Sequence, residues 1–287
     1  MQKPQDRTIR IPLIGGLGNQ LFQFAGGLAI QKSVNAEIHF FDDLIRGSKV
    51  LNITPRKVAI ENITDDQITS LGKLEVAKMV MKRIVKEGYW LSDSVQKPID
   101  LSQITSKTKV VSGYFQSRHI VDLVIDQIIA ALSKSSDFSK IVPKEQLNEI
   151  TVHMRLGDKL SRKDLKYFGR TSTDYYLNGI KVLRKDDDYD SINIVSDQPA
   201  LARQLLEAAS PKLKLNFLRG TSELEDLSLI SHSRGIVMSC SSFSWWGARL
   251  ASINSSTQVV APSNWLRNPS NFDSHMNYVS WKLLSKE

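Results

Sequence analysis

The sequence contains a single cysteine, Cys240, in 287 residues. A lone cysteine cannot form an internal disulfide or a thiolate metal cluster, which excludes the disulfide-rich secreted class and fits a reducing compartment. No apolar run approaches the roughly 18 residues that a membrane-spanning helix needs. The first ten residues, MQKPQDRTIR, lack the apolar centre of a signal peptide. We therefore expect a cytoplasmic protein.

Signatures of several catalytic classes are missing as well. The five histidines have no metal-ligand spacing. The acidic run DDDYD at 186–190 precedes its expected strand, which puts it at the amino end of a sheet, away from a ligand crevice, so we interpret it as a solvated turn. The absence of a G-x-S-x-G elbow leaves a serine hydrolase without support. We expect neither a metal ion nor another cofactor.

The composition is that of an ordinary globular protein, with 24% charged and 41% hydrophobic residues. The net charge of +8 indicates an anionic partner, which could be a nucleotide, a nucleic acid or a phospholipid surface. A non-catalytic nucleic-acid-binding protein is therefore one hypothesis. The sequence has no RNP, zinc-finger or helix-turn-helix signature, so we expect no nucleic-acid partner.

The segment LEVAKMVMKRIVKEGYW at 74–90 is the most basic helical candidate. Its pattern favours a solvated helix that buries an apolar stripe containing Val76, Val80 and Ile84. A second interpretation is a helix that lies on an anionic membrane surface, which would make the protein peripheral on the inner face of the membrane.

Short β-branched runs alternate with longer segments of helical period, which is typical of α/β units with parallel sheets. We expect strands near 9–14, 36–41, 109–112, 149–155, 191–195, 214–217, 235–238 and 257–261. We expect helices near 20–33, 118–133, 173–185, 198–209, 222–232 and 243–252. The polar segment 134–146 has no clear period, so we expect two domains, 1–140 and 147–287.

Polar residues follow several of these strands, where α/β sheets bind ligands. In VHMRLGD, His153 and Arg155 are two residues apart and share a face of the strand, and Asp158 follows a turn. Asp197 ends the next strand. This pattern indicates a small anionic ligand, although a solvent-exposed pair of Arg155 with Asp158, or Asp197 as a helix cap, would also explain it.

The segment SCSSFSWWGA provides a second set of anion-binding groups. Ser239, Ser241 and Ser242 precede an expected helix, so their hydroxyls and the first free amides form an anion site unless Ser241 or Ser242 acts only as a cap. A guanidinium, a helix N-terminus and a carboxylate together suit a nucleoside diphosphate. Trp245 and Trp246 are expected in the core first and as sugar-stacking residues second.

The glycine-rich segment GGLGNQLFQFAGG at 15–27 follows the first expected strand. It departs from the dinucleotide fingerprint because Leu21 replaces the third glycine. Gly16 and Gly18 still allow the backbone to approach a ligand, and Asn19 lies at the start of the expected helix. A purely structural strand-to-helix turn is the alternative.

Together these segments resemble the bacterial α1,2-fucosyltransferases of glycosyltransferase family 11. The resemblance is carried, in order along the chain, by GGLGNQLFQFA at 15–25, GYFQS at 113–117, VHMRLGD at 152–158, SD at 196–197, SSFSWWGA at 241–248 and APSNW at 261–265. It implies a GT-B-type fold of two facing Rossmann-like α/β domains with a donor cleft between them. The N-terminal domain would take the acceptor side and the C-terminal domain would bind the GDP-sugar.

The resemblance also implies an activity. GDP-fucose would be the donor, and L-fucose would be transferred with inversion and without a metal to the 2-hydroxyl of a terminal galactoside. A bacterial surface glycan such as O-antigen is the expected product. A glycosyltransferase of the same fold that uses another GDP-sugar or forms another linkage is the alternative.

Residue by residue, the resemblance implies that Arg155 contacts the donor's β-phosphate, that His153 and Asp197 recognise guanosine, and that Ser241 or Ser242 meets the phosphate. Asn19 would face the transferred sugar. If a general base is needed, Asp158, Glu223 and Asp226 are the candidates. The chain departs from the family pattern His-x-Arg-Arg-Gly-Asp-Tyr, because Leu156 replaces the second arginine and Lys159 replaces the tyrosine.

Overall fold

The computed structural model describes residues 7–45, 56–61, 63–64, 68–94, 98–139, 147–157, 162–168, 171–186, 188–253, 256–268 and 272–287. The chain divides into two compact units, Met1–Lys134 and Ser135–Glu287. The expected boundary segment 134–146 includes this division, and residues 140–146 lie outside the described part.

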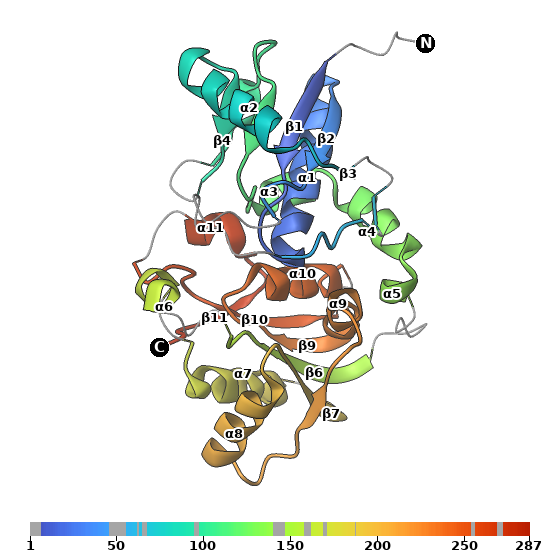
Figure 1. Cartoon of the computed structure of the whole chain (residues 1–287). Helices are drawn as coiled ribbons and strands as arrows, with labels where there is room; N and C mark the ends of the chain where they lie inside the picture. The colour runs from blue at the N-terminus through green and yellow to red at the C-terminus, as the bar shows by residue number, and fades with distance from the viewer. Residues whose placement is uncertain are drawn as a thin grey trace. The chain divides into compact units, whose positions relative to one another are not determined.

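Within the described residues of the first unit, five parallel strands form one sheet in the order β3-β2-β1-β5-β4 (Figure 1). The strands are β1 (Thr8–Pro12), β2 (Glu37–Phe41), β3 (Ile68–Thr69), β4 (Trp90–Ser92) and β5 (Val110–Ser112). Parallel neighbours require crossover connections, and a helix supplies the one between β1 and β2, as expected for an α/β fold.

The helices of the first unit are α1 (Leu17–Val34), α2 (Lys73–Val85), the short 3-10 helix η1 (Leu101–Gln103), α3 (Arg118–Asp122) and α4 (Ile125–Lys134). α1 starts three residues before its expected start, because Gly16 is its N-cap residue and the helix begins directly after it. The expected helix 118–133 is interrupted, since the amide of Val124 bonds the carbonyl of Val121 in a tight turn between α3 and α4.

In the second unit, the described residues form a six-stranded parallel sheet in the order β11-β10-β9-β6-β7-β8. Its strands are β6 (Leu147–Met154), β7 (Ser191–Ser196), β8 (Asn216–Leu218), β9 (Ser233–Val237), β10 (Gln258–Pro262) and β11 (Lys282–Leu284). β6 is central, and its last five residues are buried. The strands on both of its sides therefore end beside the segment that carries the polar motif.

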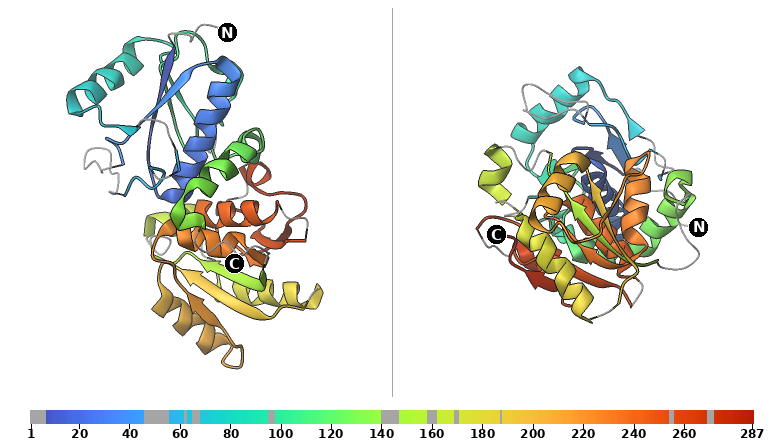
Figure 2. Two further views of the ribbon diagram at one scale, coloured as in Figure 1. Left: turned by 90° about the vertical axis from the view of Figure 1, so that its right-hand side faces the viewer. Right: turned by 90° about the horizontal axis from the view of Figure 1, so that it is seen from below.

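Helices cover both faces of this second sheet. They are α5 (Ser136–Ser139), α6 (Arg162–Phe168), α7 (Thr173–Asp186), α8 (Pro199–Ala209), α9 (Glu223–Ser231), α10 (Ser242–Ala251) and α11 (Phe272–Met276). α7 and α8 lie on one face, and α9 and α10 lie on the other (Figure 1 and Figure 2). A sheet covered on both faces is apolar on both, which explains the continuous β-branched runs in its strands.

The basic segment 74–90 forms a helix that buries one apolar side, but the expected stripe is wrong in two of its three residues. The segment forms α2, but Ile84 is 75% exposed and Val80 is also exposed, so the expected stripe is not buried. Met79 is the buried residue of this helix, with Val76 half-buried beside it. When a helix has apolar residues on more than one side, only one of these sides can pack against the sheet.

Elements that the sequence analysis missed are all short. They include β3, β4, β11, α5, α6 and α11, each of at most seven residues. Such segments span too few residues for a helical or strand period to emerge from the pattern. Across the described residues, none of the helices combines the length and apolar character needed to cross a bilayer.

Candidate functional site

His153 lies near the end of β6 and is 3% exposed. Its ring packs 5.2 Å from the ring of Phe243, and its Nδ1 lies 3.2 Å from the hydroxyl of Ser239. Burial, together with the positive charge of Arg155, lowers the pKa of His153 to about 3. The imidazole is therefore neutral at neutral pH. Ser239, predicted as an anion-site hydroxyl, contacts this imidazole instead, and Phe243 contributes to the corner although the sequence analysis gave it no role.

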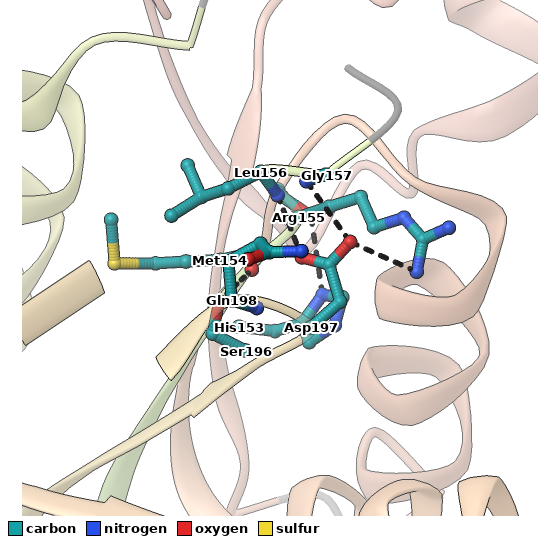
Figure 3. A network of polar contacts seen from close by, with 9 residues as sticks. His153, Met154, Arg155, Leu156, Gly157, Ser196, Asp197 and Gln198 are labelled. Atoms are coloured by element: carbon teal, nitrogen blue, oxygen red, sulfur yellow. Dashed lines mark hydrogen bonds and ion pairs between the residues drawn. The ribbon is translucent and has the colours of Figure 1, made fainter. Parts of the chain in front are cut away.

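Arg155 extends from the residue after the end of β6 toward Asp197 at the end of β7 (Figure 3). The Arg155 Nη1 atom lies 3.3 Å from Asp197 Oδ2, and both side chains remain about a quarter exposed. Asp197 also accepts hydrogen bonds from the amides of Leu156 (2.8 Å) and Gly157 (3.0 Å). One carboxylate thus joins the end of β7 to the turn after β6 and holds the guanidinium at the carboxyl edge of the sheet.

The turn after β6 requires a glycine at 157. A Cβ atom at Gly157 would lie 2.7 Å from Asp197 Oδ2, inside the contact distance of the two atoms. Ser196 adds a second connection by donating to the carbonyl of Met154 (2.7 Å). The predicted alternative for Asp197, a cap of α8, does not apply, because Gln198 is the N-cap residue and Asp197 bonds the turn instead.

Leu156, which replaces an arginine of the family pattern, points away from Arg155 (Figure 3) and is 5% exposed. It belongs to the hydrophobic core of the second unit together with Met154. The substitution therefore adds to the core, and the charge at the sheet edge comes from Arg155. Asp158 and Lys159 lie outside the described residues, so the predicted role of Asp158 as a base stays a prediction.

α10 starts at the carboxyl edge of the same sheet, directly after β9, which pairs with β6. Ser241 is the N-cap residue but makes no side-chain cap hydrogen bond, and Ser242 begins the helix. The hydroxyl of Ser244 accepts from the amide of Ser239 (3.0 Å) and fixes the turn into the helix. The edge thus combines the positive end of a helix dipole with His153 on the neighbouring strand β6 and Arg155 directly after that strand.

Trp245 and Trp246 are fully buried, which confirms their expected place in the core. The indole of Trp245 donates to the carbonyl of Met276 (2.7 Å).

In the first unit the glycine-rich segment forms the turn between β1 and α1. Gly15 has a φ of +82°, which favours glycine, and a Cβ there would lie 2.4 Å from Asn19 Nδ2. Gly16 is the N-cap residue, and Gly18 and Asn19 lie in the first turn. The Oδ1 of Asn19 accepts from Gln116 Nε2 (2.9 Å), which joins two of the motifs that carried the resemblance.

The helix that follows this turn carries two buried side-chain amides, Gln20 and Gln23. Gln20 donates to the carbonyls of Gly15 and Lys57, both at 2.9 Å. Gln23 accepts from the amide of Ile14 (3.1 Å) and donates to the carbonyl of Gly113 (2.9 Å). These side chains satisfy backbone groups around the turn, and the sequence analysis assigned neither of them this role.

The other candidate bases lie on α9, whose preceding strand β8 is separated from β6 by β7. Glu223 is exposed in the first turn of this helix. Burial raises the pKa of Asp226, although the hydrogen bond from the Gly220 amide (2.6 Å) acts in the opposite direction. Among the described residues, no three His, Cys, Asp or Glu side chains are grouped so as to hold a metal ion.

The sequence profile described as glycosyl transferase family 11 matches residues 1–283. The chain belongs to glycosyltransferase family 11. This family 11 glycosyltransferase is 23% identical over 303 residues to an O-antigen biosynthesis glycosyltransferase, WbnK, of Escherichia coli. The match covers 94% of this chain and 98% of that protein. It is 26% identical over 274 residues to an alpha-1,2-colitosyltransferase of Escherichia coli, covering 88% and 90% of the two chains.

Solved structures resemble this family 11 enzyme in fold. The fucosyltransferase NodZ from Bradyrhizobium has a TM-score of 0.51 at 12% identity, with 85% of this chain and 93% of that chain covered. The Escherichia coli heptosyltransferase WaaC with ADP has a TM-score of 0.50 at 8% identity, with 97% and 93% covered. With the two parallel sheets, this likeness confirms the predicted GT-B-type α/β fold.

Proposed function

We propose that this family 11 glycosyltransferase transfers L-fucose from GDP-fucose to the 2-hydroxyl of a terminal galactoside. The main support is the partly exposed guanidinium of Arg155, which Asp197 holds at a sheet edge beside the N-terminal turn of α10. Two sources of positive charge at one edge suit a diphosphate. The similarity to an O-antigen glycosyltransferase supports a surface glycan as the product.

The chemistry follows from the charge that develops as the donor breaks. Cleavage of the bond between the sugar and the β-phosphate leaves negative charge on GDP and an oxocarbenium-like sugar, and the acceptor hydroxyl attacks from the opposite face, which inverts the anomeric carbon. Arg155 and the first amides of α10 stabilise the departing diphosphate in this proposal. Because they are held in place beforehand, little reorganisation is needed as the charge forms.

Asp197 acts in this proposal by positioning Arg155. Its two oxygens already accept from Leu156, Gly157 and Arg155 inside the chain, which favours this role over the predicted direct recognition of guanosine. Recognition of guanosine by His153 stays a prediction, as does the role of Asn19 at the transferred sugar. The neutral imidazole of His153 avoids adding a second full charge within the buried corner.

A second candidate function is transfer of another sugar from a GDP donor. The similarity to an alpha-1,2-colitosyltransferase is the observation that favours it. Colitose is L-fucose without its 3-hydroxyl, so the two donors would present the same diphosphate to Arg155. Discrimination between them would depend on contacts to that single hydroxyl.

The proposal is tested by incubating the purified full chain with lactose or N-acetyllactosamine and with GDP-fucose, GDP-colitose or GDP-mannose in turn. GDP release and an NMR assignment of the product linkage are the readouts. A fucose α1,2-linked to galactose supports the proposal. Preferential turnover of another donor, or a different linkage, contradicts it, and failure of all three donors to bind by calorimetry contradicts the GDP-sugar class.

A further inference from the structure

α2 carries an apolar stripe on its solvent side. Its members recur at intervals of three and four residues and therefore lie along one side of the helix. They are Leu74, Ala77, Met81, Ile84 and Val85. The four large side chains are 72%, 59%, 75% and 71% exposed, so none of them belongs to the core of the unit.

The opposite side of α2 attaches the helix to its unit. Met79 is 2% exposed and packs with Phe41 and Val110, and Val76 and Trp90 lie against the same cluster. At about 100° per residue, Met79 faces nearly opposite to the centre of the exposed stripe. In Figure 1, α2 lies at the periphery of the first unit near β4. The contact with the sheet therefore leaves the stripe facing outward.

Basic residues surround the stripe. Over Lys73–Val85 the helix contains four basic residues, Lys73, Lys78, Lys82 and Arg83, against one acidic residue, Glu75. At about 100° per residue, Lys73 and Lys78 border the stripe on its two sides. Lys78 forms an exposed ion pair with Glu75 at 3.6 Å, which leaves an excess of positive charge along the helix.

We propose that α2 docks on an anionic lipid surface. A helix with an exposed apolar side and lysines along both borders lies in the plane of such a surface, with its apolar side chains at the boundary of the acyl chains and its cations at the lipid phosphates. A second copy of the chain is a poorer occupant of this face, because a symmetric contact would bring the same excess of positive charge together from both copies.

The experiment is flotation of the full-length protein with vesicles of phosphatidylcholine alone or of phosphatidylcholine mixed with phosphatidylglycerol. We expect binding to the mixed vesicles that weakens as salt is added. The double variant Leu74→Gln/Ile84→Gln is expected to lose at least ~10-fold in partition coefficient because it removes two side chains from the apolar boundary. Lys73→Glu/Lys78→Glu is expected to lose a comparable factor.

Matched controls are Val279→Gln, which alters an apolar residue that is 97% exposed in the second unit, and Lys212→Glu, which reverses an exposed lysine there. All variants should keep the wild-type circular dichroism and midpoint of thermal unfolding. Equal loss in α2 and control variants, or no preference for anionic vesicles, would overturn the proposal. Self-association that only the α2 variants abolish, without vesicle binding, would assign the stripe to a second copy instead.

This test is independent of the donor and the linkage. Vesicle binding requires no turnover, so its failure would leave the proposed fucosyl transfer intact. Conversely, a negative transferase assay would not change the partition coefficients.

Discussion

Arg155 bears a full positive charge one residue beyond the end of β6, and its carboxylate partner, Asp197, is engaged by three donors of the same turn. An arginine side chain has several rotatable bonds. Because the ion pair with Asp197 fixes the conformation of Arg155 in advance, the side chain needs little rearrangement during the proposed reaction. The guanidinium remains partly exposed, so a diphosphate can still reach it.

The Arg155→Ala variant is expected to lose at least ~10²-fold in turnover, because a charged donor at the leaving diphosphate would be missing. Steady-state kinetics with the donor and acceptor of the wild-type enzyme measures the loss. Arg184→Ala, which removes an exposed arginine from α7, is the control and should retain its rate. Near-normal turnover in a folded Arg155→Ala protein would disprove the role of Arg155.

The buried neutral His153 makes stability depend on pH. Its pKa rises from about 3 in the folded state to the ordinary 6.5 on unfolding, so the unfolded chain binds more protons between these values. The stabilisation is present above pH 6.5 and is lost as the pH falls toward 3, by up to ~1.4 kcal/mol per pH unit.

Chemical denaturation at several pH values measures this dependence. The His153→Gln variant should lose less free energy of unfolding than the wild type between pH 6.5 and pH 5, because glutamine does not titrate. Since every other titrating group is common to both proteins, the difference between the two profiles isolates His153. Parallel profiles would contradict its buried neutral state.

At the scale of elements, the position of α10 depends on its close approach to α9. A Cβ at Gly247 would lie 2.4 Å from Cγ2 and 2.9 Å from Cβ of Ile230, so glycine is required where the two helices meet. The same helix carries Trp245 and Trp246 into the core and presents its N-terminus at the site. Packing between helices thus determines where the N-terminal amides of α10 lie.

Gly247→Ala should lower the free energy of unfolding by about 1–3 kcal/mol through overpacking against Ile230. Urea denaturation of the two single variants and of the double variant Gly247→Ala/Ile230→Ala measures the coupling free energy between the two positions. The alanine at 247 should cost less when Ile230 is already truncated, because the clashing methyl is then absent. Additive losses would show that the clash with Ile230 is not the cause.

At the scale of the whole molecule, the fold brings segments distant in sequence to the carboxyl edge of one sheet. β6, β7 and β9 are adjacent, so His153, Asp197 and Ser241 come together although 88 residues of sequence separate the first from the last. A parallel sheet has this property because all of its strands end at the same edge.

Turnover is expected to persist in excess EDTA. The proposed charge stabilisation uses Arg155 and the amides of α10, which need no divalent ion, so initial rates with and without chelator should agree. Loss of activity that Mg²⁺ or Mn²⁺ restores would contradict this expectation.

The sequence by itself determined the class of fold and the candidate edge. Hydrophobic periods of 2 and of 3.6 residues are local properties of a sequence, so the bounds of most strands and helices could be predicted to within a few residues. The polar motifs could then be placed at strand ends. The motifs also carried the family resemblance, because the residues that shape the glycine-rich turn and the start of α10 are contiguous in the chain.

Only the tertiary structure decided which apolar face is covered and which polar atoms meet. The pattern of α2 contains two apolar sides, and contacts with β2 and β5 selected the one that carries Met79. Leu156 proved to be a core residue, and Asp197 proved to bond the turn after β6. Met79 and Asp197 meet partners 31 to 41 residues away in the sequence, and a local sequence pattern does not specify such partners.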